Sequence, residues 1–173
     1  MKKVELGCGF RKTPGYIGVD WVKFPGVDIV ADLSKKFPFP DNSVDELLAH
    51  HFLEHMDYYH IMNEMWRILK PEGIVKARVP YYTNHRAYMG EHKRPGFSWI
   101  SFEHYRDKTQ PFYKYEIVRN KIIFTNNKLF SWINSIINLF PFFYDRWLAH
   151  IIPSIELDLV LKKRKNFKPL KNN

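Results

Sequence analysis

The most informative part of this chain reads Val4-Glu-Leu-Gly-Cys-Gly-Phe10 and then Tyr16-Ile-Gly-Val-Asp20. Each of these two short apolar runs ends in residue types that suit a nucleotide-like ligand. Gly7 and Gly9 let the backbone come close to such a ligand, because glycine carries no Cβ. Asp20 can accept hydrogen bonds from both hydroxyls of a ribose. The two runs therefore predict that the protein binds a ligand containing adenosine.

Motifs that the sequence lacks exclude two classes of nucleotide ligand. A dinucleotide-binding G-x-G-x-x-G motif would need a third glycine where Lys12 stands, and an acid about 20 residues further on. Only ten residues separate Gly9 from Asp20, which leaves no room for a crossover helix whose N-terminus would bind a pyrophosphate. A G-x-x-x-x-G-K-[ST] phosphate loop does not occur either. The expected ligand has a ribose but no pyrophosphate.

The first half of the chain alternates between short apolar runs and connections. A helix is predicted over Tyr58–Lys70 from an apolar stripe at helical spacing, with Pro71 and Gly73 as its stop. Runs closed by turn residues or acids predict strands at Val4–Leu6, Tyr16–Val19, Asp28–Ala31, Val44–Ala49 and Ile74–Pro80. This alternation predicts a doubly wound α/β sheet that binds its ligands at the carboxyl ends of the strands.

The second half is less regular. Residues 81–116 are expected to form loops with a short helix near Ser98–Tyr105, and Ile117–Thr125 and Ile155–Lys162 are expected to be the last strands. Between them, Leu129–Tyr144 carries no charge and has serines and asparagines on one helical face and large apolar residues on the other. We expect the apolar face to pack on the sheet; a hydrophobic lid or a shallow membrane contact is the alternative.

The motifs of residues 3–80 resemble, in order, those of the class I S-adenosylmethionine-dependent methyltransferase family, of the small-molecule type. Glu5-Leu-Gly-Cys-Gly9 looks like its first motif, and His50-His-Phe-Leu-Glu-His55 and Trp66–Gly73 look like the exit of its fourth strand and the entry of its fifth. The resemblance implies a single-domain Rossmann-like fold, with a mostly parallel sheet of six to seven strands and an antiparallel edge strand.

The same resemblance implies S-adenosylmethionine as the cofactor. Asp20 would bind the ribose, Trp21 would lie against the adenine, and Asp32 would accept from the adenine amino group. The residues expected to line the cofactor site are Glu5, Gly7, Cys8, Gly9, Asp20, Trp21, Asp32, Leu33 and His50.

Methyl transfer is an in-line displacement, so the protein mainly supplies alignment and, for a hydroxyl acceptor, a base. Histidine is suited to act as that base near neutral pH. His51 follows the fourth strand and His92 lies in the loop after the fifth, so both are predicted to flank the pocket mouth as the catalytic pair. The expected reaction is O-methylation of a small-molecule or a lipid- or sugar-linked acceptor.

Two other functions compete with this one. His51-Phe-Leu-Glu-His55 matches the H-x-x-E-H signature of zinc peptidases, but a strand is predicted to end there, so we assign no metal ligand. The other alternative is a non-catalytic or RNA-directed module with the same cofactor fold. It would dock on RNA or an anionic membrane through residues 162–172, which hold six of the 27 basic residues and no acid.

Composition sets the remaining expectations. We expect one methyltransferase domain over residues 1–161 and a basic C-terminal tail over 162–173, in a chain with a net charge of +9. The single cysteine, Cys8, excludes an internal disulfide and favours a cytoplasmic protein, peripheral to the membrane if the tail contacts it. Because the sequence begins on its first strand, a homodimer partner is expected to cover the pocket.

Overall fold

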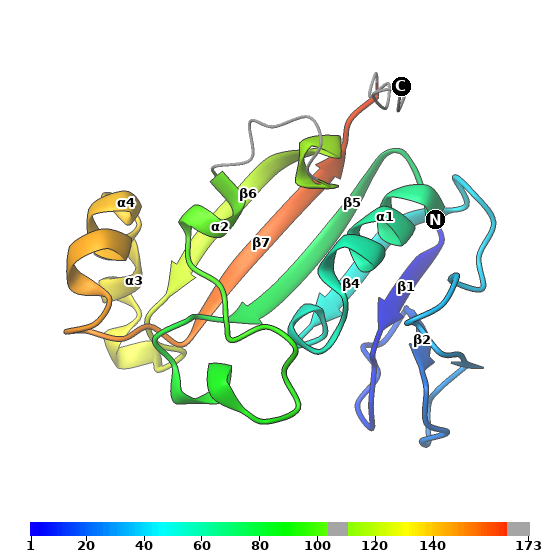
Figure 1. Ribbon diagram of the computed structural model, residues 1–173, viewed down its shortest axis with the longest axis horizontal. Helices are drawn as coiled ribbons and strands as arrows, with labels where there is room; N and C mark the ends of the chain where they lie inside the picture. The colour runs from blue at the N-terminus through cyan, green and yellow to red at the C-terminus, as the bar shows by residue number, and fades with distance from the viewer. Residues whose placement is uncertain (104–110, 166–173) are drawn as a thin grey trace.

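The computed structural model describes residues 1–103 and 111–165. Its described strands form one seven-stranded sheet in the order β3-β2-β1-β4-β5-β7-β6 (Figure 1). The first five of these strands in the sheet are parallel, and β7 runs antiparallel to both β5 and β6. This confirms the predicted fold class, a mostly parallel Rossmann-like sheet that ends in an antiparallel pair.

The strands are β1 (Lys3–Leu6), β2 (Ile17–Asp20), β3 (Ile29–Val30), β4 (Val44–His50), β5 (Leu69–Pro80), β6 (Tyr115–Ile123) and β7 (Glu156–Lys163). The α-helices are α1 (Tyr58–Ile68), α2 (Ile100–Glu103), α3 (Trp132–Ile137) and α4 (Pro141–Phe143), and α4 continues as a π-helical turn over Tyr144–Leu148. Short 3₁₀ helices cover Leu53–His55, His85–Tyr88, Pro111–Lys114 and Lys128–Phe130. The helix expected near Ser98–Tyr105 is α2, and residues 104 and 105 lie outside the described part of the chain.

The connection between β1 and β2 contains no helix, as the spacing predicts. β1 nevertheless pairs directly with β2 in parallel, with Val4 opposite Ile17. The Asp28 carboxylate accepts hydrogen bonds from the Gly18 backbone N–H at 2.7 Å and from the Lys12 ammonium at 2.8 Å, which ties the connection to β2. The turn that follows β1 is therefore free to face a ligand.

Helix α1 forms where the apolar stripe predicts it and covers one face of the sheet beside β4 and β5 (Figure 1). Asp57 caps its N-terminus by accepting from the His60 backbone N–H at 2.7 Å. The helix ends at Ile68 and β5 begins at the next residue, so Pro71 and Gly73 lie inside the strand and do not follow the helix as a stop. The strand accommodates them because residues 70–73 bulge out of its pairing with β4.

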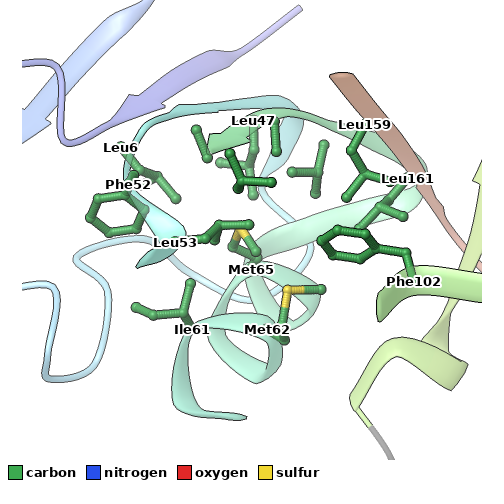
Figure 2. Packing of buried hydrophobic residues seen from close by; sticks show 14 of the residues in the cluster. Leu6, Leu47, Phe52, Leu53, Ile61, Met62, Met65, Phe102, Leu159 and Leu161 are labelled. Atoms are coloured by element: carbon green, nitrogen blue, oxygen red, sulfur yellow. The ribbon is translucent and has the colours of Figure 1, made fainter. Parts of the chain in front are cut away.

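The hydrophobic core lies between α1 and the sheet. Figure 2 shows Ile61, Met62 and Met65 of α1 pointing toward Leu47 of β4 and Leu159 of β7. All five side chains are fully buried. Removing this apolar surface from water is the main force that fixes α1, and thus the residues just before it, against the sheet.

Arg67 at the end of α1 holds the loop that leads into β4. Its guanidinium donates two hydrogen bonds to Glu64, at 2.8 and 2.7 Å, and further ones to the carbonyls of Phe37 and Phe39. Glu64 also accepts from the Phe37 backbone N–H at 2.7 Å. The bonds from Arg67 lower the pKa of Glu64, so this carboxylate stabilises the fold while it is ionised.

Replacing Glu64 by glutamine is therefore expected to cost about 1–2 kcal/mol of stability at pH 7. A lowered pKa in the folded state means that this contribution is present above about pH 4.3 and fades as the pH falls through the folded value. Urea unfolding of both proteins at pH 7 and pH 3 measures this directly. A stability difference of the same size at both pH values would contradict the assignment.

The segment Leu129–Tyr144, which was expected to pack its apolar face on the sheet, turns its polar face toward the sheet instead. Helix α3 turns Asn134 and Asn138 toward the edge strand β6, where their amides bond to the backbone of Ile122, Phe124 and Thr125 at 2.7–3.1 Å. The edge strand has unpaired N–H and C=O groups that need partners, and the asparagines supply them. The prediction for this face is wrong, and most large apolar side chains of the segment point outward.

These outward side chains form a surface that we call the apolar face. It consists of Leu129, Phe130, Trp132, Ile136, Leu139, Phe140, Phe142, Phe143, Trp147, Ile151 and Ile152, all exposed. Ile137, Tyr144 and Ala149 anchor the segment in the core. No helix in the described part of the chain has the length and apolarity needed to cross a membrane.

Part of the predicted basic tail belongs to the folded sheet. β7 continues through Lys163, whose ammonium is buried and donates to the carbonyls of Trp66 and Leu69 at 2.8 and 2.6 Å. Lys162 pairs with Glu72 and Arg164 donates to the Tyr115 carbonyl. These three charges brace the fold. Residues 166–173 lie outside the described residues.

Candidate functional site

A cavity of about 720 Å³ opens at the carboxyl ends of β1, β2 and β3, and we call it the cofactor cavity. Its lining includes five of the predicted cofactor residues, namely Gly7, Asp20, Trp21, Asp32 and Leu33. The chain also contributes Phe52, His55 and Met56 to the wall, from the turn that follows β4. Residues far apart in sequence thus meet where the parallel strands end.

Asp20 organises this cavity. The carboxylate is buried at 6% exposure and accepts hydrogen bonds from the Gly9 N–H at 2.8 Å and the Val22 N–H at 3.1 Å. A carboxylate offers about four lone-pair sites, so two remain for the hydroxyls of a ribose. Asp20 therefore shapes the glycine turn and faces the ligand space with spare acceptor capacity.

The two glycines of the turn have different roles. Both have positive φ, 66° at Gly7 and 53° at Gly9. A Cβ on Gly7 would lie 2.6 Å from the ring of Phe52, whereas a Cβ on Gly9 would meet no atom within 4 Å. Gly7 is required by internal packing, and Gly9 leaves open space beside the backbone that a ligand can approach.

Glu5, Cys8, Gly9 and His50 lie outside the lining of the cofactor cavity. Glu5 accepts from the backbone N–H and the hydroxyl of Thr13, at 2.6 and 3.1 Å, and so braces the connection after β1. Burial raises the pKa of the Cys8 thiol, which argues against a nucleophilic cysteine. Burial, followed by the nearby Arg78, lowers the pKa of His50. A direct cofactor contact by these four residues stays a prediction.

Asp32 forms a turn at the cavity rim. One carboxylate oxygen accepts from the backbone N–H and the hydroxyl of Ser34, at 3.0 and 2.6 Å, and the other lies 3.3 Å from the Lys35 ammonium. The bonds from Ser34 lower the pKa of Asp32. The carboxylate is half exposed, so its contact with an adenine amino group stays a prediction.

A second cavity of about 710 Å³ adjoins the first, and we call it the acceptor cavity. Its lining includes His51 and His92, the predicted catalytic pair, together with Asn84, Ile155 and Glu156. His51, His55 and Glu91 line both cavities. This shared wall is where a group could pass from a ligand in one cavity to a ligand in the other.

His51 lies at the junction that the sequence predicts, just after β4. Its φ is 50°, and its ring nitrogens lie 3.3 Å from a carboxylate oxygen of Glu54 and 3.3 Å from one of Glu156. The hydrogen bond to Glu156, and then that to Glu54, raises the pKa of His51 to about 9. Both ring nitrogens face acceptors, so His51 is a hydrogen-bond donor here. Its role as a base stays a prediction.

His92 is held by a short network. Its Nδ1 lies 3.1 Å from the Ala87 carbonyl, and its ring stands edge-on to that of His55 with centroids 4.5 Å apart. The next two backbone N–H groups, of Lys93 and Arg94, both donate to the carbonyl of Glu54. The loop after β5 is thereby fastened to the turn after β4.

The structure does not support the peptidase alternative. The H-x-x-E-H motif needs both histidines on one face of a helix, but the helix here is a three-residue 3₁₀ turn over Leu53–His55. His51 precedes it with positive φ. The two histidines therefore do not form the helical pair of a zinc peptidase.

Three further residues belong to the site but were not predicted from the sequence, namely Phe52, Glu54 and Glu156. Phe52 packs on Gly7, and Glu54 and Glu156 enclose His51. In the sequence, Glu54 stood out only as the glutamate of the H-x-x-E-H motif. Glu156 begins β7, and only the sheet order brings it beside β5 and the end of β4.

Residues 4–76 match the family model described as a methyltransferase domain. None of the curated proteins compared with the sequence matches it. Solved structures match well over nearly the whole chain. A protein from Bacillus subtilis has a TM-score of 0.61 at 14% identity, with 96% of this chain and 92% of that one covered.

Two further matching structures are named as methyltransferases. An S-adenosylmethionine-dependent methyltransferase from Mesorhizobium loti has a TM-score of 0.55 at 16% identity, covering 94% of this chain and 90% of that one. A putative methyltransferase from Haloferax volcanii, solved with a methyltransferase activator, has a TM-score of 0.57 at 19% identity, covering 94% and 82%.

Sheet order, cofactor cavity and structural matches together define the Rossmann-like fold of methyltransferases. Residues 4–76 thus resemble a methyltransferase domain, and the chain has the fold of solved S-adenosylmethionine-dependent methyltransferases.

Proposed function

We propose that this enzyme methylates a hydroxyl oxygen of a lipid-linked acceptor held in the acceptor cavity. The observation that carries the proposal is the wall of His51, His55 and Glu91, which is common to both cavities. A methyl group can be transferred only between ligands whose reacting atoms lie in line and in contact. The proposed site of transfer is this wall.

The residues at the cofactor cavity fit S-adenosylmethionine. Spare lone pairs on the buried Asp20 suit its ribose, and the open space at Gly9 suits a close approach to the backbone. When bound, the cofactor supplies a methyl group on a positively charged sulfur. The chain supplies the orientation of both ligands.

His51 and His92 are proposed to face the acceptor from two sides. Both ring nitrogens of His51 already direct hydrogen bonds at carboxylates, so His51 contributes a positive charge beside the acceptor and no further hydrogen bond. His92 is suited to accept a hydrogen bond, since Nε2 keeps a free lone pair when Nδ1–H donates to the Ala87 carbonyl. The proton of the acceptor hydroxyl is proposed to leave on the His92 side.

The apolar face supports a lipid-linked acceptor. It ends at Ile152, and Pro153, Ser154 and Ile155 directly after it line the acceptor cavity. Residues 126–155 hold a single acid, Asp145, whose carboxylate is turned inward to Tyr81 and Trp99, and the exposed charges among them are Lys128 and Arg146. Tryptophan and phenylalanine beside cations are typical of surfaces that rest on an anionic bilayer.

The reaction is tested by incubating the purified chain and radiolabelled S-adenosylmethionine with a membrane-lipid extract, a sugar mixture and total RNA in separate assays. We expect label in the lipid fraction only, in a product whose methyl group resists mild base, as an ether does. Label confined to RNA or to the sugars, or an ester product that mild base hydrolyses, would contradict the proposal.

The membrane contact is tested with a double variant, Phe140→Ser with Trp147→Ser. Two large exposed side chains lose their apolar contact with lipid, so binding to vesicles with anionic lipid is expected to weaken by about 10-fold or more. Flotation of vesicles measures this. Val118→Ser, an exposed apolar residue of β6 outside the face, is the control and should bind like the wild type.

The same experiments distinguish two other partners that could cover the apolar face, a protein activator and a second copy of this chain. The Haloferax volcanii protein was solved with an activator, and a second copy of this chain was expected from the sequence. Light scattering that shows a dimer dissociated by the double variant, without vesicle binding by either protein, would replace the membrane by a second copy. A wild type that is monomeric and binds no vesicles would also overturn the membrane assignment.

A further inference from the structure

We propose that Glu54, His55 and His92 form a binding site for a divalent transition-metal ion, with Zn²⁺ the best match, at the wall between the two cavities. The proposal deepens the function proposed above and rests on it for the cation's role. One potential ligand atom from each of the three side chains lies within 4.8 Å of the others, the only such group of three found among the described residues. No metal ligand was assigned from the sequence.

Glu54 gives the strongest indication. Its side chain is 1% exposed, and its Oε2 has no hydrogen-bond partner in the described part of the chain. A buried carboxylate oxygen without a partner is costly, because it has lost its hydration. Oε1 is held 3.3 Å from His51, so Oε2 is the oxygen left to bind a cation.

His92 is prepared in the way that metal ligands usually are. A ligating histidine commonly donates its second ring nitrogen to a carbonyl, which fixes the tautomer and the ring orientation. His92 Nδ1 lies 3.1 Å from the Ala87 carbonyl, which leaves Nε2 as the ligand. The edge-on contact of His92 with His55 keeps both rings beside the carboxylate.

The backbone keeps the three ligands together. Glu54 and His55 share one 3₁₀ turn, and the Glu54 carbonyl accepts from the N–H groups of Lys93 and Arg94 at 2.9 and 3.2 Å. The Arg94 guanidinium is stacked over Tyr58 and Phe97, 4.9 Å from each ring, which fixes the end of the loop that carries His92. The ligand set therefore comes from two anchored segments.

The donor set determines the class of metal. Imidazole nitrogens suit zinc, copper, iron or nickel, whereas Mg²⁺ and Ca²⁺ prefer oxygen ligands. Two histidines and one glutamate, with a fourth position open, form a known arrangement of catalytic zinc. Ligands at a tetrahedral Zn²⁺ lie about 3.3 Å apart for bond lengths of about 2.0 Å. Side-chain rotations would close the remaining gap.

The open position would face the acceptor cavity, which all three ligands line. A hydroxyl bound there loses its proton more easily, because the cation stabilises the oxyanion. The proton passes to solvent through the open cavity, the oxygen forms a bond to the methyl carbon, and the carbon–sulfur bond breaks, leaving S-adenosylhomocysteine. With the cation bound, the Nε2 lone pair of His92 is a metal ligand, so the proton leaves to solvent and not to His92; this replaces the role given to His92 in the site without a cation.

The test is a Zn²⁺ titration of the full chain after treatment with a chelator, followed by calorimetry. We expect one ion per chain in the wild type and a loss of affinity of about 100-fold or more in His92→Ala, His55→Ala and Glu54→Gln. His85→Ala is the matched control, because His85 lines the same cavity outside the cluster and should leave Zn²⁺ affinity unchanged. Binding of Co²⁺ gives a visible spectrum that reports the ligand set independently.

Two outcomes would overturn the site. One is a wild type that does not bind Zn²⁺ one-to-one. The other is equal Zn²⁺ affinity in the wild type and in His92→Ala. His92 is partly exposed, so this variant should keep the fold intact. Methyl transfer at full rate in the presence of a chelator would refute the role of the cation but leave the proposed function standing. A chain that binds Zn²⁺ but labels no lipid would refute the proposed function and leave the site.

Discussion

Asp20→Ala is expected to weaken the binding of S-adenosylmethionine by about 100-fold or more. The carboxylate holds the Gly9 and Val22 N–H groups and keeps acceptor capacity for the ribose. Hydrogen bonds to a charged group contribute about 1.5–3 kcal/mol each, so the loss of the ribose contacts alone reaches this size. Calorimetry with S-adenosylhomocysteine, the spent cofactor, measures the affinity without turnover.

The matched control for Asp20 is Asp28→Ala. Asp28 also accepts from a backbone N–H of β2, that of Gly18 at 2.7 Å, but it does not line the cofactor cavity. We expect Asp28→Ala to lower stability and leave the affinity for S-adenosylhomocysteine within about threefold of wild type. Asp20→Asn preserves the size of the side chain and separates loss of charge from collapse of the turn. Unchanged affinity in both Asp20 variants would remove Asp20 from the cofactor site.

The cofactor half of the site could be predicted from the sequence because its determinants are local. Gly7, Gly9 and Asp20 stand within two strands and the turn between them, and the short spacing is enough by itself to exclude a crossover helix. Parallel strands then bring their carboxyl ends to one edge of the sheet, so Leu33 and Asp32 also arrive at the cavity.

The acceptor half could not be predicted in the same way. His51 was located correctly after β4, but its electrostatic environment depends on Glu156, which reaches it through the antiparallel insertion of β7 beside β5. The position of β7 beside β5 in the sheet cannot be derived from a single sequence. Glu54 looked like part of a peptidase motif, whereas its burial and its free oxygen are properties of the folded turn.

The orientation of α3 shows a different limit. Periodicity separates a polar from an apolar face but does not say which one meets the protein. Here the edge strand β6 has backbone groups to satisfy, and Asn134 and Asn138 meet that need better than any apolar side chain. The apolar residues are then left outside. Exposing them to water costs free energy. This cost is removed if the apolar face is covered in the working enzyme, as the proposed membrane contact requires.

Gly7→Ala is expected mainly to lower stability and Gly9→Ala mainly to weaken cofactor binding, although both glycines have positive φ. The new Cβ on Gly7 meets Phe52 at 2.6 Å, so we expect a loss of stability of about 3 kcal/mol from overpacking and backbone strain together. On Gly9 it meets open space, and the strain alone costs about 1 kcal/mol. The space it fills is the one proposed for the cofactor, so affinity for S-adenosylhomocysteine should fall by about tenfold or more.

Urea unfolding and calorimetry on both variants separate stability from binding. Adding Phe52→Leu to Gly7→Ala should recover part of the lost stability, since the smaller side chain relieves the contact that the alanine creates; on Gly9→Ala the same change should give no gain. If Gly9→Ala binds S-adenosylhomocysteine as well as the wild type, the cofactor does not approach the turn at this residue. In that case Gly9 is a glycine only because its φ of 53° suits one, and Asp20 holds its N–H for the shape of the turn alone.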